Sequence, residues 1–381
     1  MAAPVTVARE LTGGLSIGFG PSWEQMAIAR SLLAGRGFAD PFGFPTGPTA
    51  VCAPLHPLLL AAILRIFGDS PAAAVPALLV EAAIHVACLV LLVRISAAVF
   101  ASWVPGLLAA AAVLACARPS PQWENGMAAL AAEVFFLCLL TRSAATVGII
   151  AGLGWLISPS LILLSFPAAF FLRSGRYAGR MALVALFATA PWLVRNALAF
   201  HTPVFLRDNF GLELFISNND LAGPGQRDTL QRYRLLHPNE NAAAARELIR
   251  SGEPRYFSQL QSEAFQWIRH HPRRFLVLTV ERIGLWWAYN WFVTIVSVFG
   301  VTGLWIFRGA PLGRAASAAV FFFPLPYYVI QFDPRYAYPV LWLLALFAGF
   351  SMWRLLRWAL DFRDRGSLNG TSSTVPVGSP K

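Results

Sequence analysis

Long apolar runs recur along most of the chain, and they constrain its fold more than any other feature because each must be kept away from water. Seven of them are long enough to cross or deeply enter a bilayer; they span residues 72–93, 103–117, 126–140, 181–200, 285–307, 315–332 and 340–356. Two shorter runs, 146–157 and 160–172, meet at Pro159 and predict a tilted hairpin or a re-entrant pair. Hydrophobic residues make up 57% of the chain and charged residues 13%, about half the charged share of a soluble domain. The sequence therefore excludes a soluble enzyme, a disordered tail or a fibrous repeat and predicts an all-α membrane protein, a polytopic helical bundle.

The arginines between these runs predict how the bundle is oriented. Short cytoplasmic loops accumulate Lys and Arg, and one orientation places most short-loop arginines inside: Arg94, Arg142, Arg173, Arg176, Arg180, Arg308, Arg314, Arg354, Arg357, Arg363 and Arg365. The short outside loops then hold only Arg118 and Arg335, and of the 19 acidic residues only Asp361 and Asp364 lie in an inside segment. Carboxylate chemistry is therefore expected on the extracytoplasmic face. The net charge of +11 is spread between apolar runs, which excludes a nucleic-acid partner.

These patterns divide the chain into five segments: a first extracytoplasmic loop with short helices (1–70), N-terminal transmembrane helices (71–200), an extracytoplasmic segment (201–283), C-terminal transmembrane helices (284–358) and a cytoplasmic tail (359–381). Residues 242–283 carry apolar side chains three and four apart, which predicts amphipathic helices on the outer membrane surface. Gly252 to Pro254 should break them, and His271-Pro272 should end the second piece. The tail from Asp361 is rich in Ser, Gly, Thr and Pro, so we expect it to be disordered. Residues 1–20 contain no apolar run of even 12 residues, so we expect a leading helix missing from the N-terminus or a misplaced start.

Charged side chains at the outer ends of the apolar runs are the candidates for chemistry, because such groups are costly there without partners. Glu24 begins a predicted helix, and a Gly- and Pro-rich loop with Asp40 and His56 follows it. The alternative for Glu24 is a solvated carboxylate that only complements the helix dipole. Glu124 occupies a short outside loop. Arg195 ends the run 181–200 and is either a binding group or an arginine anchored at the membrane interface.

Two further stretches mix acids, amides and arginines. Arg207, Asn209 and Glu213 follow a predicted spanning helix, and residues 333–339 form an outside turn with Arg335 and Tyr336. Guanidinium groups pair bidentately with phosphate oxygens, and amides can read sugar hydroxyls. The alternative is an ordinary polar loop. These stretches therefore predict a phosphate or sugar site.

Other titratable residues predict no separate chemistry. Glu81 and His85 lie one turn apart within an apolar run, which indicates a buried pair; a proton relay, and with it a transporter, is the alternative. The histidines show no ligand spacing such as His-Glu-x-x-His. We therefore expect no metal site and no cofactor, although the need for a divalent cation stays open.

The ordered series of short motifs resembles a known family. The motifs are Trp23-Glu24 with Ile28-Ala29-Arg30, Gly35-Arg36-Gly37-Phe38, Thr46-Gly47-Pro48-Thr49, Pro54-Leu55-His56-Pro57, Pro191-Trp192 with Arg195-Asn196, Asn209-Phe210-Gly211-Leu212-Glu213, and Arg335-Tyr336 with Pro339. Together they look like the GT-C superfamily of polyprenyl-phosphate-sugar-dependent glycosyltransferases, near glycosyltransferase family 39 and the lipid A aminoarabinose and protein O-mannosyl transferases. In that family the first outside loop commonly carries an Asp followed by a second acid. Here Glu24 stands alone, with Asp40 farther along.

The resemblance implies a GT-C-type bundle and a direct displacement with inversion at the anomeric carbon of the sugar. Glu24 would take the proton of the acceptor hydroxyl, with Glu124 and Asp40 as the other catalytic candidates. The implied substrate-binding residues are Arg195, Arg207, Asn209, Glu213, Arg335, Tyr336, His56 and Trp23. Trp23, Trp123 and Trp192 would stack on sugar rings or belong to the interfacial aromatic belt.

The implied partners are a polyprenyl-phosphate-linked sugar, a lipid, glycan or protein acceptor, and membrane lipids. The implied location is the bacterial inner (plasma) membrane, with the active face periplasmic or extracellular. The alternative from another class is a non-catalytic or degenerate GT-C-like protein, or a transporter of lipid-linked sugars.

Overall fold

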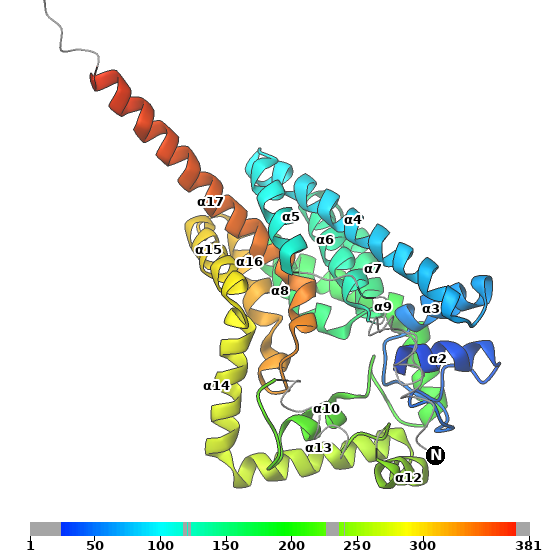
Figure 1. The fold of residues 1–381 in the computed structure, drawn as a ribbon. Helices are drawn as coiled ribbons and strands as arrows, with labels where there is room; N and C mark the ends of the chain where they lie inside the picture. Colours follow the sequence, from blue (N-terminus) through cyan, green and yellow to red (C-terminus); the bar gives the residue numbers. More distant parts are fainter. Residues whose placement is uncertain (1–23, 117–119, 121–122, 226–235, 240, 371–381) are drawn as a thin grey trace, which may run out of the picture.

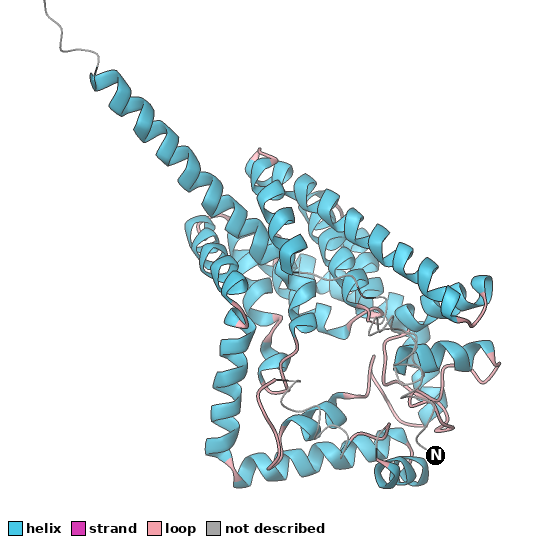
Figure 2. Ribbon diagram, in the orientation of Figure 1, coloured by secondary structure: helices cyan, strands magenta, loops and turns pink. Residues whose placement is uncertain are grey.

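The protein is helical throughout the part of the chain that the computed structural model describes, residues 24–116, 120, 123–225, 236–239 and 241–370. Within these ranges three stretches are long and apolar enough to cross a membrane: Pro71–Phe100, Gly175–Phe200 and Pro334–Phe362. They contain α4 (Ala74–Phe100), α9 (Gly175–Phe200) and most of α17 (Pro334–Gly370). The bent pair α14 (Pro272–Ala288) and α15 (Trp291–Phe307) makes a fourth if it counts as one span. The prediction of an all-α helical bundle is confirmed (Figures 1 and 2).

Helix α17 forms the centre of the bundle. In its most apolar window 72% of the residues are buried, against 22% for the span that contains α4 and 17% for α9. Helices α5 (Val104–Cys116), α6 (Asn125–Thr141) and α15 pack around it. Trp342 on α17 meets Phe136 on α6 edge to face, with ring centroids 5.4 Å apart. The outer helices thus present apolar side chains outward while α17 supplies the core.

A pair of short helices follows α6. Helix α7 (Ala144–Trp155) packs on α9, and α8 (Ile162–Leu172) packs on α16 (Pro311–Phe322). Between them lies a single 3-10 turn, Pro159–Leu161. The predicted break at Pro159 is confirmed. It arises because proline lacks the N–H that a continuous helix would need at this position. The turn brings Ser158 and Ser160 to the end of the bundle.

Two apolar runs do not form the continuous segments that we expected. The run 285–307 is broken between α14 and α15, whose axes differ by 84°. The Asn290 side chain causes the break, because it accepts the Val293 N–H at 2.8 Å and caps a new helix. The run 315–332 is helical only to Phe322, after which Pro324 and Pro326 give the 3-10 turn Leu325–Tyr328.

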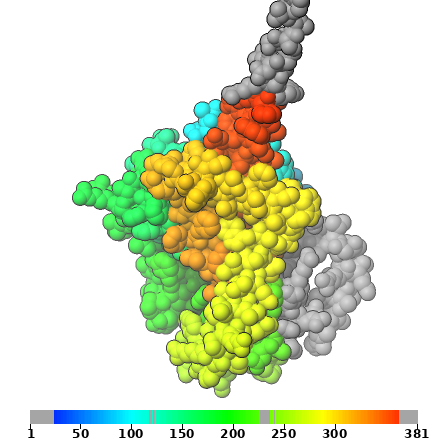
Figure 3. Space-filling view, turned by 90° about the vertical axis from the view of Figure 1, so that its left-hand side faces the viewer, coloured from blue at the N-terminus to red at the C-terminus, as the bar shows by residue number. Residues whose placement is uncertain are grey.

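A second layer of helices covers one end of the bundle. It contains α2 (Glu24–Leu33), α3 (Leu55–Phe67), α10 (Phe210–Ser217), α12 (Ala242–Ser251) and α13 (Glu253–His270). The predicted breaks are confirmed: Gly252, with φ of +79°, separates α12 from α13, and α14 begins at Pro272. In Figure 1 this layer lies at the opposite end from the α4–α5 turn and the C-terminal part of α17. Helix α14 runs as a continuous column between the two levels (Figure 3).

The C-terminal tail is more ordered than its composition suggests. We expected disorder from Asp361, but α17 continues to Gly370. Adding residues to an existing helix gains one hydrogen bond per residue without a new nucleation step, so a long helix can extend through Ser and Gly. The expected disorder of residues 371–381 lies outside the described residues.

We expect Gly211→Ala to destabilise the second layer. A Cβ atom at Gly211 on α10 would lie 2.1 Å from the backbone oxygen of Phe257 on α13, so the two helices would have to separate. Overpacking of this kind costs about 1–3 kcal/mol. Thermal unfolding in detergent should show a lower midpoint for this variant. Gly284→Ala on α14 is the matched control, because its Cβ meets no atom within 4 Å; an equal loss in both variants would contradict the close approach of α10 and α13.

Candidate functional site

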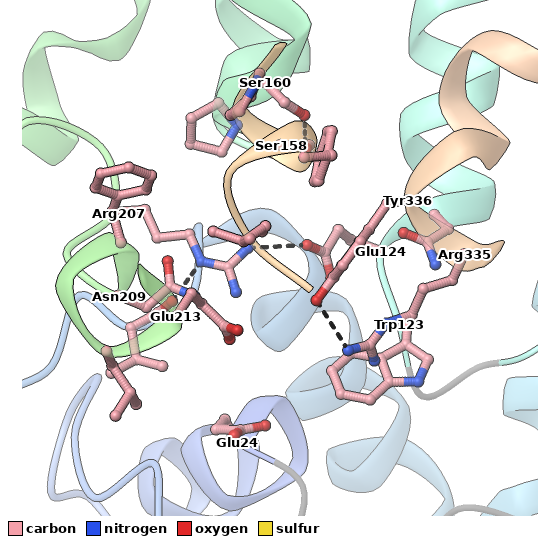
Figure 4. A pocket seen from close by; sticks show the side chains of 18 of the residues that line it. Glu24, Trp123, Glu124, Ser158, Ser160, Arg207, Asn209, Glu213, Arg335 and Tyr336 are labelled. Carbon is pink, nitrogen blue, oxygen red and sulfur yellow. Dashed lines mark hydrogen bonds and ion pairs between the residues drawn. The ribbon is translucent and has the colours of Figure 1, made fainter. Parts of the chain in front are cut away.

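Residues from distant parts of the chain line one cavity of ≈ 320 Å³ between the second layer and the bundle. The predicted site residues on its wall are Glu24, Glu124, Arg207, Asn209, Glu213, Arg335 and Tyr336. Figure 4 shows Arg207 and Glu213 on one side of it, Arg335 and Tyr336 on the other, and Glu24 below them. The structure therefore brings three carboxylates and two guanidinium groups to one place.

Glu24 enters the cavity from the first turn of α2. Its side chain is only 12% exposed, and this burial raises the pKa of Glu24 to about 7; Glu213 also raises it, while Arg335 and Arg207 lower it. A carboxyl of this kind exchanges a proton near neutral pH, which is what a general base needs.

Glu124, directly before α6, has the opposite environment. Its Oε1 lies 3.2 Å from Nη1 of Arg207, and its Oε2 accepts a hydrogen bond from Gln25, the neighbour of Glu24 on α2. Burial alone raises the pKa of this carboxyl, but the Arg207 charge, together with His56, a backbone hydrogen bond and Gln25, outweighs burial, so the pKa of Glu124 lies below its ordinary value. The two carboxylates of one cavity thus differ in pKa, because Glu124 forms a direct ion pair with Arg207 whereas burial dominates for Glu24.

The guanidinium of Arg207 is bonded on two sides, and its remaining nitrogen faces the cavity. Its Nε donates to the backbone oxygen of Val51 at 2.5 Å, and Nη1 binds Glu124. No hydrogen bond from Nη2 to the described residues is found. In Figure 4 the remaining nitrogen points into the open space beside Glu213.

Glu213 and Asn209 come from α10 and the residue before it. The Oε2 atom of Glu213 is buried and has no hydrogen-bond partner among the described residues. Burial raises the pKa of Glu213, while Arg207 and Arg335 lower it. An unpaired buried carboxyl oxygen on a cavity wall is suited to a hydroxyl of a bound molecule, because leaving it unpaired is costly.

Arg335 and Tyr336 begin α17 on the opposite wall. The Arg335 guanidinium lies over the Trp123 ring, 3.6 Å from its centroid, and its Nη2 is 3.4 Å from the Tyr336 hydroxyl. Its Nε is 3.5 Å from Asp333. One face of Trp123 is thus occupied by Arg335, so that face does not stack on a sugar ring in this arrangement.

Asp40 and His56 do not line the cavity. Asp40 has a φ of 58° and accepts the backbone N–H groups of Thr46 and Gly47, each at 3.0 Å, so it closes its own loop. Burial opposes the charged form, but Arg36 and the two backbone N–H groups together lower the pKa of Asp40 below its ordinary value. His56 is 2% exposed; burial lowers its pKa to about 4, although the Glu124 charge acts against this. Asp40 is thus a support of its own loop, His56 is buried at the start of α3 away from the cavity wall, and Trp23 lies outside the described residues.

Arg195 is also placed away from the cavity. Its Nη2 donates to the Phe38 backbone oxygen at 2.6 Å and its Nη1 to that of Thr49 at 2.7 Å. Its guanidinium also lies 4.9 Å from the Trp192 ring centroid. Arg195 therefore fastens the first loop to α9, because its nitrogens are directed at backbone carbonyls of that loop. The same loop is held from α13 by Glu253, which accepts from Ala50 N–H at 2.6 Å.

We expect Arg195→Gln to lower stability without weakening the binding of a phosphate. The shorter amide cannot reach both carbonyls, and buried acceptors left without donors cost about 1–3 kcal/mol. A thermal unfolding midpoint measured in detergent should fall. Arg65→Gln, an exposed position on α3, should change it little. A loss of phosphate affinity at unchanged stability would contradict this role of Arg195.

Sequence analysis missed several polar groups on the cavity wall, among them His237, Ser158 and Ser160. His237 lies in a long polar segment with no periodic pattern, so no sequence signal identifies it. Ser158 and Ser160 flank Pro159, and their hydroxyls are 2.9 Å apart. The proline was a visible signal for a break, but not for a site.

A separate polar pair lies inside the bundle. Nδ1 of His85 is 2.9 Å from the backbone oxygen of Glu81 and 3.5 Å from its carboxylate, and both side chains are buried. The predicted buried pair is confirmed. Among the described residues no group of three or more His, Cys, Asp or Glu side chains is arranged to hold a metal ion.

Comparison with protein-family models, with curated proteins and with solved structures found no significant match to this chain.

Proposed function

We propose that the protein is an integral-membrane glycosyltransferase of the GT-C type. It moves a sugar from a polyprenyl-phosphate carrier to an extracytoplasmic acceptor, with inversion. The observation that carries the proposal is the convergence of Glu24, Glu124, Arg207 and Arg335 on one cavity, although they come from α2, from the residue before α6, from the segment before α10 and from α17. Two carboxyl groups whose pKa values are shifted in opposite directions, beside two guanidinium groups, suit proton transfer coupled to departure of a phosphate.

In the proposed reaction Glu24 takes the proton of the acceptor hydroxyl while that oxygen attacks the anomeric carbon. The bond from this carbon to the phosphate oxygen breaks, and its electron pair leaves with the lipid phosphate. Arg207 and Arg335 bind the phosphate as its negative charge grows. Glu124 keeps Arg207 in place. The products are the glycosylated acceptor, with inverted configuration, and polyprenyl phosphate.

The remaining wall of the cavity fits a lipid-linked donor. Phe210, Leu212, Ile330 and Pro339 line it together with the charged groups, so one molecule with a charged head and an apolar chain could contact both. Arg335 and Tyr336 at the start of α17 line the cavity, whereas Arg354 and Arg357 lie farther along the same helix, toward its C-terminal part, which Figure 1 shows at the opposite end of the bundle from the second layer. If Arg accumulates on the cytoplasmic side, the cavity faces the periplasm or the cell exterior. The bacterial inner membrane is the location that the family resemblance implies, and it forms part of this proposal.

The test is sugar transfer by the purified full-length protein in liposomes. The probes are polyprenyl phosphates that carry glucose, mannose, galactose or arabinose, with a lipid extract of the cell envelope as acceptor. We expect mass spectrometry to detect a new glycoside and free polyprenyl phosphate, and NMR to show inverted anomeric configuration. Movement of an intact donor across the bilayer without cleavage would instead support the transporter. Loss of the gene should remove the same glycoside from the envelope.

A further inference from the structure

His237 is the one imidazole on the cavity wall among the described residues, and neither the sequence motifs nor the proposed reaction uses it. Its Nε2 atom lies 3.6 Å from Oε1 of Glu24. Its Nδ1 atom accepts the backbone N–H of Asn239 at 3.2 Å. Because Nδ1 accepts, Nε2 carries the proton of the neutral ring and directs an N–H group at the carboxylate.

The surroundings of His237 keep it neutral and in place. Its side chain is 2% exposed, and the ring meets Phe42 edge to face with centroids 5.3 Å apart. Burial lowers the pKa of His237 to about 3, so the ring carries no charge near neutral pH. Three other charged groups act on Glu24: Glu213 on α10, Arg207 before it, and Arg335 at the start of α17.

We propose that His237 is the positioning residue of Glu24: its neutral imidazole presents Nε2–H to one carboxylate oxygen and leaves the other oxygen to meet the acceptor hydroxyl. This inference rests on the proposed transfer reaction. The contact is longer than a full hydrogen bond, and catalytic contacts of this kind shorten when substrate closes the site.

The neutrality of the partner matters for the chemistry. A cation binds a carboxylate strongly and weakens it as a base, which is the relation between Arg207 and Glu124 in the same cavity. A neutral N–H orients the carboxylate with a much smaller effect on its basicity. The two carboxylates thus have different partners, and only the one beside the imidazole can take up a proton near pH 7.

The experiment titrates Glu24 directly. In the full-length protein, pH-difference infrared spectra contain the Glu24 carboxyl band, which is assigned by its loss in Glu24→Gln. His237→Phe keeps the ring shape but removes N–H. Because a donor stabilises the charged carboxylate, its loss should raise the Glu24 midpoint by about one pH unit. His237→Gln, whose amide can place an N–H near the Nε2 position, should stay near the wild-type midpoint.

The transfer rate gives the second readout. In His237→Phe the rise of the rate with pH should move upward by the same amount, with a drop of about fivefold at pH 7, while His237→Gln retains most of the rate. A structural role alone would lower the rate at all pH values equally and leave the midpoint unchanged, and this result would overturn the proposal.

A measurement on the wild-type protein covers the case in which variants do not fold. Nitrogen NMR of labelled histidine should show His237 as the neutral Nε2–H tautomer between about pH 5 and pH 8. A cationic ring, or a proton on Nδ1, would overturn the proposal. None of the spectroscopic results requires sugar transfer, so a wild-type protein without transferase activity would refute the proposed function separately.

Discussion

Glu24→Gln should abolish most of the sugar transfer while the protein stays folded. The amide has nearly the same shape as the carboxyl but cannot accept the proton of the acceptor hydroxyl. Removing a general base lowers kcat by about 10²–10⁴. The KM for the lipid-linked donor should change little, because Arg207 and Arg335, not Glu24, are expected to bind the phosphate. Initial rates with the wild type and the variant, measured at saturating donor, test this.

The pH dependence of the wild-type rate has a definite sign. Burial raises the pKa of Glu24 to about 7, so below that pH the carboxyl holds a proton and cannot act as a base. The rate should therefore rise as the pH increases through about 7 and level off above it. In Glu24→Gln the residual rate should lose this rise. A wild-type rate that falls with pH in the same interval would contradict the assignment.

The matched control is Asp69→Asn. It makes the same carboxylate-to-amide change at an exposed ion pair, 2.9 Å from Arg30 on α2, outside the cavity. We expect it to retain nearly full activity, because exposed pairs contribute about 0–1 kcal/mol. If Glu24→Gln is fully active and Glu124→Gln is inactive, the base is Glu124. If both variants are fully active, the assignment of the catalytic site to this cavity is wrong.

The helices of the bundle were largely predictable, because a long apolar run in the sequence shows directly which residues must be kept away from water. Runs such as 126–140 and 181–200 correspond closely to α6 and α9. Proline and glycine breaks were also visible, as at Pro159 and Gly252. The break inside 285–307 was not, because it depends on one Asn side chain that caps a helix in the middle of an apolar run. Average hydropathy does not register such a cap.

The site was predictable in residue type but not in placement. Arg195 lies in the last turns of α9 and Arg207 follows that helix, and the two look equivalent in the sequence. Arg195 binds the carbonyl of Phe38, 157 positions earlier, while Arg207 binds Glu124 at the edge of the cavity. The difference arises from how the first loop folds over the bundle, which no local pattern encodes. His237 was missed for the same reason, since only the tertiary fold brings it to Glu24.

Arg207→Lys should weaken both donor binding and catalysis, although it keeps the positive charge. Arg207 uses separate nitrogens for Val51, for Glu124 and for the cavity. A lysine ammonium is a single point and cannot serve all three in fixed geometry. Loss of one preorganised donor to a developing negative charge lowers the rate by about 10²–10³. We therefore expect kcat/KM for the lipid-linked sugar to fall by this factor, measured against Arg250→Lys, a surface arginine on α12.

Product inhibition separates the two roles that Arg207 has in this scheme. Polyprenyl phosphate carries the leaving phosphate but no sugar and no reacting hydroxyl, so its affinity reports phosphate binding alone. If Arg207 binds phosphate, Arg207→Lys should weaken inhibition by polyprenyl phosphate, whereas Arg195→Gln should not. If the rate falls but this inhibition is unchanged, Arg207 acts only by holding Glu124. In that case Arg335, the other guanidinium on the wall, must bind the phosphate, and Arg335→Lys should then show the loss of inhibition instead.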